Sequence, residues 1–489
     1  MASVCFYFQV HQPYRIKKYR IFDVGHDHKY FNDKSDRDIN NEKILHKVAD
    51  KCYLPTNKVM LELLEKHPEF KISFSLSGVF LDQIEEFSPE TLRSFQKLVD
   101  TGRVEILDET YYHSLAFLYS RDEFVRQVNL HRAKVKKLFG VEPTAFRNTE
   151  LIYSNELAQA VEAMGYTSIL AEGADHVLGW RSPNFLYNPP STKKLKLHLK
   201  NFRLSDDIAF RFSSKDWAEW PLSSEKFAHW VNQVNGNGNV VNLFMDYETF
   251  GEHQWEDTGI FEFLRHMPGE ILKHPDNDFV TVSEAAARYP SVGEVDVPFY
   301  MSWADVERDL SAWLSNAMQH DAMGNIYALE KDVFATKDPA LIEDWRKLTT
   351  SDHFYYMCTK WFADGDVHKY FNPYDTPYEA FIGYNNVLSD MRWRVATAKA
   401  GPKPKKNPPA PARKVTRVAT KAPAKTKLKA KKKAAQMKVP KRPAGAPRTV
   451  EIKIKTKPKT AAKTATKMAV PTKPGQKLAS KLKLAISKG

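Results

Sequence analysis

Short apolar runs alternate with amphipathic segments through residues 1–295. The first apolar run, SVCFYFQV (3–10), begins almost at the N-terminus and has the composition of a strand. The same patterns predict strands at 71–77, 103–107, 146–152, 168–171 and 240–244, and helices at 57–66, 89–99, 121–138, 155–163 and 225–234. Strands that alternate with helices indicate βαβ units, so the expected fold class is α/β with a parallel sheet closed into a barrel.

The pattern changes at about residue 302, beyond which few strands are predicted. Helices are expected at 303–318, 338–347, 351–362 and 377–394, which indicates a helical C-terminal domain (296–396) packed on the barrel domain (1–295). Residues 397–489 are rich in Lys, Ala, Pro and Thr and contain no aromatic residue. Such a segment cannot bury enough apolar surface to offset chain entropy, so a disordered tail is expected there.

The net charge of +14 divides unevenly along the chain. Residues 401–489 hold 28 of the 73 basic residues and one of the 59 acidic ones, which leaves 45 basic and 58 acidic residues in 1–400. The basic character therefore belongs to the tail, which resembles the tails of linker histones. We expect it to bind nucleic acid or another polyanion without sequence preference, because it lacks aromatic side chains for base stacking. A solubilising tail, or a tether to an acidic surface, is the alternative.

The three cysteines, Cys5, Cys52 and Cys358, are odd in number and widely spaced, with no CxxC pair. This usage argues against a disulfide framework or a zinc site and fits a reducing compartment. The first residues lack a basic segment followed by a long apolar run, and no apolar stretch approaches a membrane span. We therefore expect a cytoplasmic protein without a membrane segment.

Four segments place carboxylates, histidines and aromatics where predicted strands end. They are HQPYR (11–15), GRVEILDETYYHSL (102–115), FRNTELIY (146–153) and LFMDYETFGEHQ (243–254). A glycosidase needs one ionised and one protonated carboxyl group at the scissile bond, with aromatic rings and polar groups to hold the sugar. These segments contain all three kinds of group.

The four segments resemble the ordered motifs of glycoside hydrolase family 57, in particular its α-amylase-like members. A fifth segment, SWADVERDLSAW (302–313), resembles the motif that opens the helical region of that family. The resemblance covers about residues 1–395 and excludes the tail. It implies a distorted (β/α)7 barrel and a retaining mechanism on α-1,4-glucans through a glycosyl-enzyme intermediate.

Residue by residue, the resemblance implies Glu150 as nucleophile and Asp246 as general acid/base. It implies substrate contacts for His11, Glu109, Glu248, Trp303 and Asp305, and His113 is either another contact or a hydrogen-bonded support. Arg147 stands where some relatives have tryptophan, which bears on specificity.

The two proposed catalytic carboxyl groups lie 96 positions apart, so only the ends of nearby strands could bring them together. Asp246 has to keep its proton near neutral pH, and we expect ionised Glu150 to raise its pKa. No metal or cofactor is expected, since the HDH run at 26–28 lacks further ligands. Trp217, Trp220 and Trp255 are candidates either for sugar stacking or for the core.

Several functions compete with hydrolysis by an α-amylase mechanism. A 4-α-glucanotransferase would use the same two residues, with a sugar hydroxyl in place of water. A glucan-binding protein with an idle site and a chromatin protein are further alternatives. A deacetylase barrel would need a His/Asp metal cluster, which the sequence lacks. The oligomeric state does not follow from the sequence.

Overall fold

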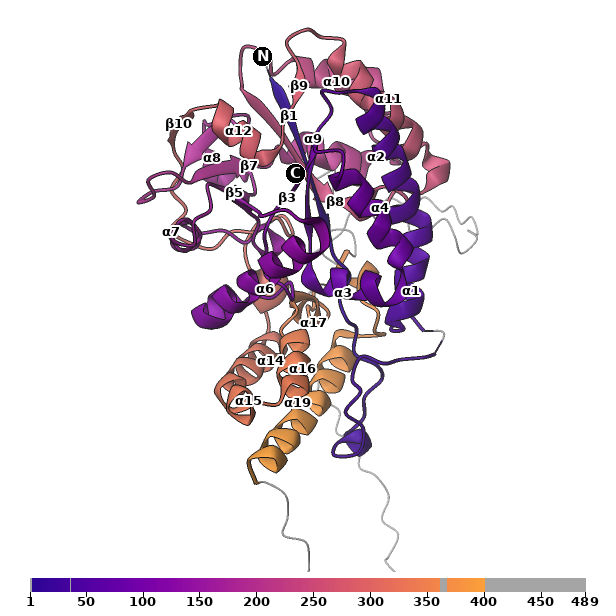
Figure 1. Ribbon diagram of the computed structural model, residues 1–489, viewed down its shortest axis with the longest axis vertical. Coiled ribbons are helices and arrows are strands. Elements are labelled where there is room, and N and C mark those ends of the chain that lie inside the picture. Colours follow the sequence, from indigo (N-terminus) through magenta and orange to yellow (C-terminus); the bar gives the residue numbers. More distant parts are fainter. Residues whose placement is uncertain (1, 36, 361–366, 401–489) are drawn as a thin grey trace, which may run out of the picture. The chain divides into compact units, whose positions relative to one another are not determined.

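The computed structural model describes residues 2–35, 37–360 and 367–400 (Figure 1). Its strands form two five-stranded sheets. The first has the order β3–β2–β1–β8 with β9 also paired to β1, and the second has the order β10–β6–β7–β5–β4. The strands are β1 (Ser3–Val10), β2 (Ile72–Leu76), β3 (Val104–Ile106), β4 (Ala145–Phe146), β5 (Ser168–Ala171), β6 (Leu186–Asn188), β7 (Lys196–Leu199), β8 (Val240–Asp246), β9 (Asp278–Phe279) and β10 (Ser291–Glu294).

Strand β1 lies at the centre of the first sheet, and all eight of its residues are buried. It pairs in parallel with β2 on one side and with β8 on the other. Parallel strands covered on both faces read as continuous apolar runs, which explains the composition of residues 3–10. The register pairs Val10 with Leu76 and Gln9 with Asp246, so the three strands end at one common edge.

Hydrogen bonds also connect the two sheets. An isolated parallel bridge joins Asp108, just after β3, to Phe146 of β4. At the other edge, the Asn201 N–H donates to the Asn242 carbonyl (2.9 Å), and Asn242 Nδ2 donates to the Leu199 carbonyl (3.0 Å). The parallel strands β8, β1, β2, β3, β4, β5 and β7 are therefore each connected to the next by hydrogen bonds. The residues of β7 and just after it are in turn hydrogen-bonded to β8.

Helices cover the sheets, and helix signals in the sequence explain where they begin and end. In α6, the Ser120 side chain accepts a hydrogen bond from the Glu123 N–H, and Gly140 ends the helix with φ 72°. Helices α2, α4 and α11 lie together on one side of β1 and β8 (Figure 1). The helices of residues 41–288 are α1 (Asn41–Val48), α2 (Leu54–Lys66), α3 (Gly78–Phe87), α4 (Pro89–Val99), α5 (Ala116–Tyr119), α6 (Arg121–Phe139), α7 (Asn155–Ala163), α8 (Asp175–Leu178), α9 (Phe202–Asp206), α10 (Ser224–Asn232), α11 (Ile260–Leu272) and α12 (Val282–Arg288).

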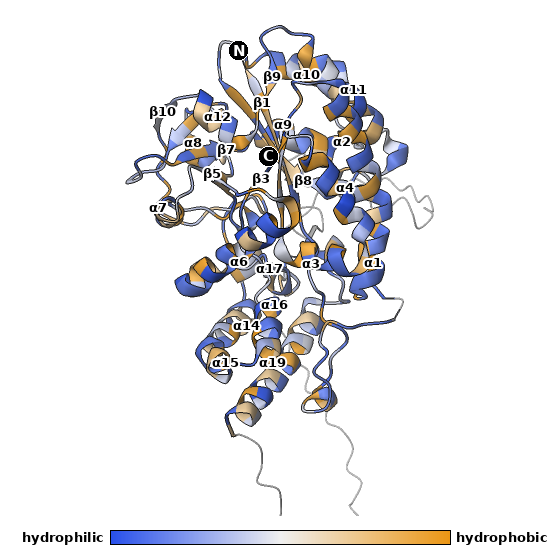
Figure 2. Ribbon diagram, viewed as in Figure 1, coloured by the Kyte–Doolittle hydropathy of each residue, from blue (hydrophilic) through white to orange (hydrophobic). Residues whose placement is uncertain are grey.

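Among the described residues beyond 310, all the regular elements are helices, as the sequence predicts. Trp313, Trp345 and Leu388 belong to the same apolar cluster as Phe146 and Ile169 of the second sheet. The helical region therefore buries apolar residues against strands as well as within itself, and Figure 2 shows hydrophobic and hydrophilic stretches alternating along its helices. Its helices are α13 (Ser311–Leu314), α14 (Ala317–Ala328), α15 (Glu330–Thr336), α16 (Pro339–Leu348), α17 (Ser351–Tyr355), α18 (Val367–Tyr370) and α19 (Pro377–Ala400). The predicted tail beyond residue 400 lies outside the described residues.

Three predicted elements are wrong in extent. The expected helix at 303–318 is instead an irregular turn followed by α13 and α14, because Asp305 and Arg308 have φ values of 55° and 54°. The expected strand at 146–152 stops at Phe146, since Glu150 has a φ of 58°. The expected helix at 351–362 ends at Tyr355. Positive φ values are rare outside glycine, and the apolar pattern gives no sign of them.

Within the described ranges, no helix combines the length and apolar character that crossing a membrane requires. The three cysteines are free and buried.

Candidate active site

Polar side chains follow four parallel strands at the edge where those strands end. His11 follows β1, Glu109 lies three residues after β3, Glu150 follows β4, and Asp246 is the last residue of β8. The carboxyl ends of parallel strands are where side chains from different strands meet in barrel-like folds.

Glu150 lies in a left-handed turn, η3 (Thr149–Leu151), with φ 58° and ψ 26°. Such a conformation costs about 1–3 kcal/mol at a residue other than glycine, and it persists where surrounding contacts hold it. Its Oε2 accepts a hydrogen bond from Trp303 Nε1 (2.9 Å), and its Oε1 accepts one from Ser351 Oγ (3.3 Å). Both carboxylate oxygens are thus held by residues from the helical region and its entry turn.

Two stacked histidines lie beside Glu150. The rings of His11 and His113 have centroids 4.0 Å apart and planes 20° apart. His113 Nε2 is 3.4 Å from Glu150 Oε1, and its Nδ1 is 2.9 Å from Glu109 Oε2. Glu109 is fully buried and also accepts from Gln9 Nε2 (3.1 Å). These contacts make Glu109 and His113 supports of Glu150, and direct substrate contact stays a prediction for both.

The two histidines differ in charge. Burial lowers the pKa of His113, but its hydrogen bonds to Glu109 and Glu150 outweigh this effect and raise the pKa to about 9. Burial and the charge of His113 lower the pKa of His11. A neutral His11 then donates from Nε2 to Asp352 Oδ2 (3.0 Å) and accepts at Nδ1 from Ser77 Oγ (2.7 Å). A cationic His113 therefore faces Glu150, with neutral His11 behind it.

Glu150 and Asp246 have opposite pKa shifts. Burial raises the pKa of Glu150, but the hydrogen bond and charge of His113 and the charge of Arg147 bring it below the usual value. Burial, followed by the negative charge of Glu150, raises the pKa of Asp246 to about 6. The direction of this shift is the one expected from the charge of Glu150, although burial is the larger cause. Glu150 is thus ionised at neutral pH, and Asp246 keeps its proton to a higher pH than an ordinary aspartate does.

Glu248 lies just beyond Asp246, in the turn η5 (Tyr247–Thr249). Its Oε1 accepts a 2.5 Å hydrogen bond from the Tyr53 hydroxyl. Burial and the charge of Asp246 raise the pKa of Glu248 to about 8. Glu248 is therefore neutral at pH 7, and it adds no negative charge near Asp246.

Two cations lie against the ring of Trp303. The Arg147 guanidinium is 5.0 Å from the ring centroid, and the Lys200 ammonium is 5.5 Å from it. Arg147 is fully buried, and none of its three side-chain nitrogens has a hydrogen-bond partner among the described residues. Both charges lower the pKa of Asp246, against the larger effects that raise it.

Asp305 contacts the helical region. Its carboxylate binds Lys360 Nζ (3.2 Å) and His368 Nε2 (2.9 Å). Burial raises the pKa of Asp305, but the hydrogen bond and charge of His368 bring it below the usual value. These ion pairs give Asp305 a structural role, and its contact with substrate stays a prediction.

The sequence did not identify two residues that complete the site. Ser351 and Asp352 begin α17, which lies about 200 positions after Glu150, so no local spacing connects them to it. Asp352 accepts a hydrogen bond from His11. Burial raises the pKa of Asp352, but the interaction with His11 and the positive charge of His113 hold that pKa well below the usual range. Arg147 lies inside a recognised motif, but only its burial shows that it is an unpaired cation. A carboxylate beside a histidine in SDHF was the one available signal for Asp352.

Among the described residues, no group of three or more His, Cys, Asp or Glu side chains is arranged to hold a metal ion. In the HDH run, His28 Nδ1 lies 2.7 Å from Asp390 Oδ2, and the Gly25 N–H donates to Oδ1 of the same carboxylate (2.6 Å). His28 thus connects the 17–31 loop to α19.

The chain is similar to known proteins both in sequence and in fold. The sequence profile described as "Glycosyl hydrolase family 57" matches residues 5–298. A putative alpha-amylase of Methanocaldococcus jannaschii is 42% identical over 405 residues, which cover 80% of this chain and 84% of that protein. A 4-alpha-glucanotransferase of Thermococcus litoralis is 23% identical over 51% of this chain and 38% of its own length.

Among solved structures, a GH57-type branching enzyme from Pyrococcus horikoshii matches with a TM-score of 0.57 at 15% sequence identity. The match covers 76% of this chain and 87% of that one. At this identity the likeness concerns the fold alone.

Proposed function

This chain belongs to glycosyl hydrolase family 57, and from that premise we propose that it cleaves α-1,4 bonds in glucans with retention, in the manner of an α-amylase. Glu150 is the nucleophile and Asp246 the general acid/base. One observation carries the proposal: an ionised glutamate acts electrostatically on an aspartate whose pKa is raised to about 6. Carboxyl groups with opposite pKa shifts are what a retaining glycosidase requires.

In the first step, a carboxylate oxygen of Glu150 attacks the anomeric carbon. The bond from that carbon to the glycosidic oxygen breaks, and Asp246 gives its proton to the departing oxygen. The leaving glucan gains a free 4-hydroxyl, and the remaining sugar is esterified to Glu150. Hydrogen bonds from Trp303 and Ser351 hold the attacking carboxylate in one orientation.

In the second step, Asp246 works as a base. Esterification removes the negative charge of Glu150, which is one of the two causes that raise the pKa of Asp246. Asp246 is then ionised more readily and takes a proton from water, while the water oxygen attacks the anomeric carbon and releases Glu150. Two inversions at one carbon retain its configuration.

A 4-α-glucanotransferase is the second candidate, because a protein of that name matches half of this chain. The 4-hydroxyl of another glucan would replace water in the second step, and the same two carboxyl groups would serve. We place hydrolysis first since the match to the putative alpha-amylase covers far more of both proteins.

Incubation with maltoheptaose tests both candidates. Hydrolysis yields only shorter chains, transfer also yields longer ones, and proton NMR of the first products shows the α-anomer if configuration is retained. The Glu150→Gln variant should lose activity in either case. Equal activity of this variant and wild type would remove Glu150 from the mechanism. A wild type that binds starch but yields no product would be a glucan-binding protein with an idle site.

The domain organisation, the role of the basic residues and the location in the cell are also part of the proposal. The hydrogen bonds at both outer sheet edges support a distorted (β/α)7 barrel in residues 1–295, followed by a helical domain in 296–396. The basic residues beyond 400 would bind nucleic acid or another polyanion, and a gel-shift comparison with a chain ending at residue 400 tests this. Three free, buried cysteines support a cytoplasmic location.

A further inference from the structure

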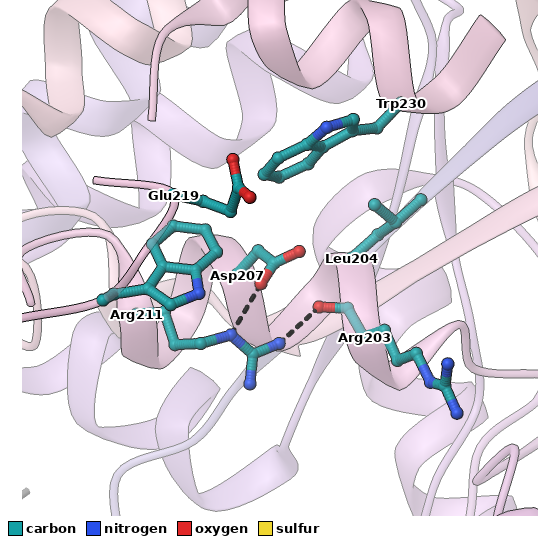
Figure 3. Close-up of a pocket in the computed structure, with 7 residues that line it drawn as sticks. Arg203, Leu204, Asp207, Arg211, Glu219 and Trp230 are labelled. Atoms are coloured by element: carbon teal, nitrogen blue, oxygen red, sulfur yellow. Dashed lines mark hydrogen bonds and ion pairs between the residues drawn. The ribbon is translucent and has the colours of Figure 1, made fainter. Parts of the chain in front are cut away.

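A pocket of about 450 Å³ lies where α9 and the following turn η4 (Asp207–Arg211) meet α10 (Figure 3). Its volume is within the roughly 300–1,000 Å³ range of small-molecule sites. It is open to solvent and shares no lining residue with the candidate active site. Its lining includes Asp207, Arg211, Trp217, Glu219 and Trp230.

Two tryptophans form the aromatic part of this pocket. The rings of Trp217 and Trp230 have centroids 6.0 Å apart and planes 70° apart. Both side chains are half-buried, because they pack against the apolar core beside them and also line the pocket. Aromatic surface anchored by the core yet facing an open pocket is suited to stacking on a flat ligand.

The polar part of the pocket is an ion pair between Asp207 and Arg211, and a further hydrogen bond fixes the guanidinium. Asp207 is buried and accepts from Arg211 Nε (2.6 Å), and Arg211 Nη2 donates to the Arg203 carbonyl (2.8 Å). Glu219 and Trp230 lie opposite this pair in Figure 3. The turn that carries Asp207 and Arg211 is π-helical, a conformation that often occurs at functional sites.

We propose that this pocket is a second α-glucan-binding site, which holds glucosyl units away from the catalytic carboxyl groups. The choice of glucan as ligand rests on the proposed function. Two guanidinium groups (Arg203, Arg211) balance two carboxylates (Asp207, Glu219) in the lining, so the pocket suits an uncharged polyol better than a phosphate or a cation. Aromatic faces pack on the apolar faces of pyranose rings, and the charged groups bind hydroxyls as donors and acceptors.

The pocket also adjoins the elements of the active site. Asp206, next to Asp207, accepts from Lys200 Nζ (3.0 Å), and that ammonium lies 5.5 Å from the ring of Trp303. Gln254, from the motif that contains Asp246, donates to the Ala209 carbonyl of η4 (2.8 Å). Residues 206–211 therefore contact groups beside the candidate active site, and Asp207 and Arg211 of the same segment line the pocket. A long chain bound in the pocket would raise the local concentration of substrate at the active site.

Affinity electrophoresis in gels that contain soluble starch tests binding in the full chain. Glu150→Gln serves as the background, so that the ligand is not consumed. We expect Trp217→Ala and Trp230→Ala to weaken retention by starch about tenfold. Trp393→Ala, on α19, is the matched control because Trp393 is 45% exposed and lies outside the pocket. Glu219→Ala, with a side chain 52% exposed, is a third variant that leaves the core intact if the tryptophan variants do not fold.

Kinetics on the wild-type background separate this site from the active site. The pocket variants should lower kcat/KM on starch about tenfold and leave kcat/KM on an activated maltotrioside within about twofold. Retention equal to that of the control, or equal losses on both substrates, would overturn the proposal. If the wild type cleaves no glucan but loses starch binding on Trp217→Ala, the proposed function is wrong. The proposal of a glucan-binding site in this pocket would still be supported.

Discussion

The indole Nε1 of Trp303 donates a 2.9 Å hydrogen bond to Oε2 of Glu150, and the Trp303 backbone N–H donates to the Glu150 carbonyl at 3.3 Å. The proposed nucleophile is thus held at its side chain and its backbone by one residue, 153 positions further along the chain. The ring of the same tryptophan faces Arg147, whose charge lowers the pKa of both carboxyl groups, and Lys200, whose charge lowers that of Asp246. Trp303 therefore links the geometry of the nucleophile to its electrostatic surroundings.

The Glu150→Gln substitution should lower the pKa of Asp246 from about 6 towards the ordinary aspartate value, because it removes the nearest negative charge among the causes of the shift. A ¹³C NMR titration of the aspartate carboxyl carbons in both proteins measures this change. Glu219→Gln, in the separate pocket, is the control and should leave the Asp246 titration where it is. An Asp246 pKa that is the same in all three proteins would mean that the charge of Glu150 does not contribute to it.

The His113→Gln substitution should raise the pKa of Glu150, because the hydrogen bond and charge of His113 hold that pKa low. Glu150 attacks only when ionised, so the acid limb of the kcat/KM profile should move to higher pH. Loss of a hydrogen bond to a charged group, about 1.5–3 kcal/mol, corresponds to roughly a 10- to 100-fold lower kcat/KM.

His229, an exposed histidine of α10, is the matched control for that experiment. His229→Gln should leave both the rate and the pH profile unchanged. A lower rate in His113→Gln without any movement of the acid limb would contradict the electrostatic role of His113.

The parts of the site that could be predicted are those with local signals. The helices Pro89–Val99 and Asn155–Ala163 begin and end where the sequence predicts, since apolar spacing and N-terminal Pro or Ser residues mark them. His11, Glu150 and Asp246 are identifiable because they follow apolar strands within recognisable motifs. Ser351 and Asp352 carry no such mark, since only tertiary packing brings α17 to Glu150.

Backbone conformation is a second feature that could not be predicted from the sequence. The turn at 303–310 reads as the start of a helix, but Asp305 and Arg308 take positive φ values that side-chain periodicity does not encode. Trp217 was a candidate for sugar stacking from its type alone, and only the structure places it with Trp230 in a pocket that Glu150 and Asp246 do not line.

The Asp352→Asn substitution should destabilise the fold at neutral pH and much less in acid. The folded-state pKa of Asp352 is depressed, so its charged form stabilises the protein above the unfolded pKa of about 4. That contribution is lost as the pH falls below about 4 towards the folded-state pKa. Urea denaturation at pH 7 should show a free energy of unfolding lower by about 1–3 kcal/mol than in wild type, and a smaller difference at about pH 3. A difference that is constant with pH would show that the substitution removes packing contacts, and not the interaction of the charged carboxylate with His11 and His113.

The Arg147→Met substitution should separate stability from activity. Arg147 is fully buried without a hydrogen-bond partner among the described residues, so its desolvation is offset only by the Trp303 ring and the nearby carboxylates. Methionine fills a similar length of space without a charge, and replacement of buried charges by apolar residues is often neutral or stabilising by about 1–4 kcal/mol. Thermal unfolding should therefore give a Tm equal to or above that of wild type.

Activity should fall in the same Arg147→Met protein. The Arg147 charge lowers the pKa of both Glu150 and Asp246, so its removal should move both limbs of the kcat/KM profile to higher pH. Arg147→Lys, which keeps a cation, is the control and should retain the wild-type limbs more closely. If the Met and Lys variants shift the pH profile equally, the shape of the guanidinium matters and its charge does not. A large loss of Tm in the Met variant would show that Arg147 is a net stabilising residue of the fold.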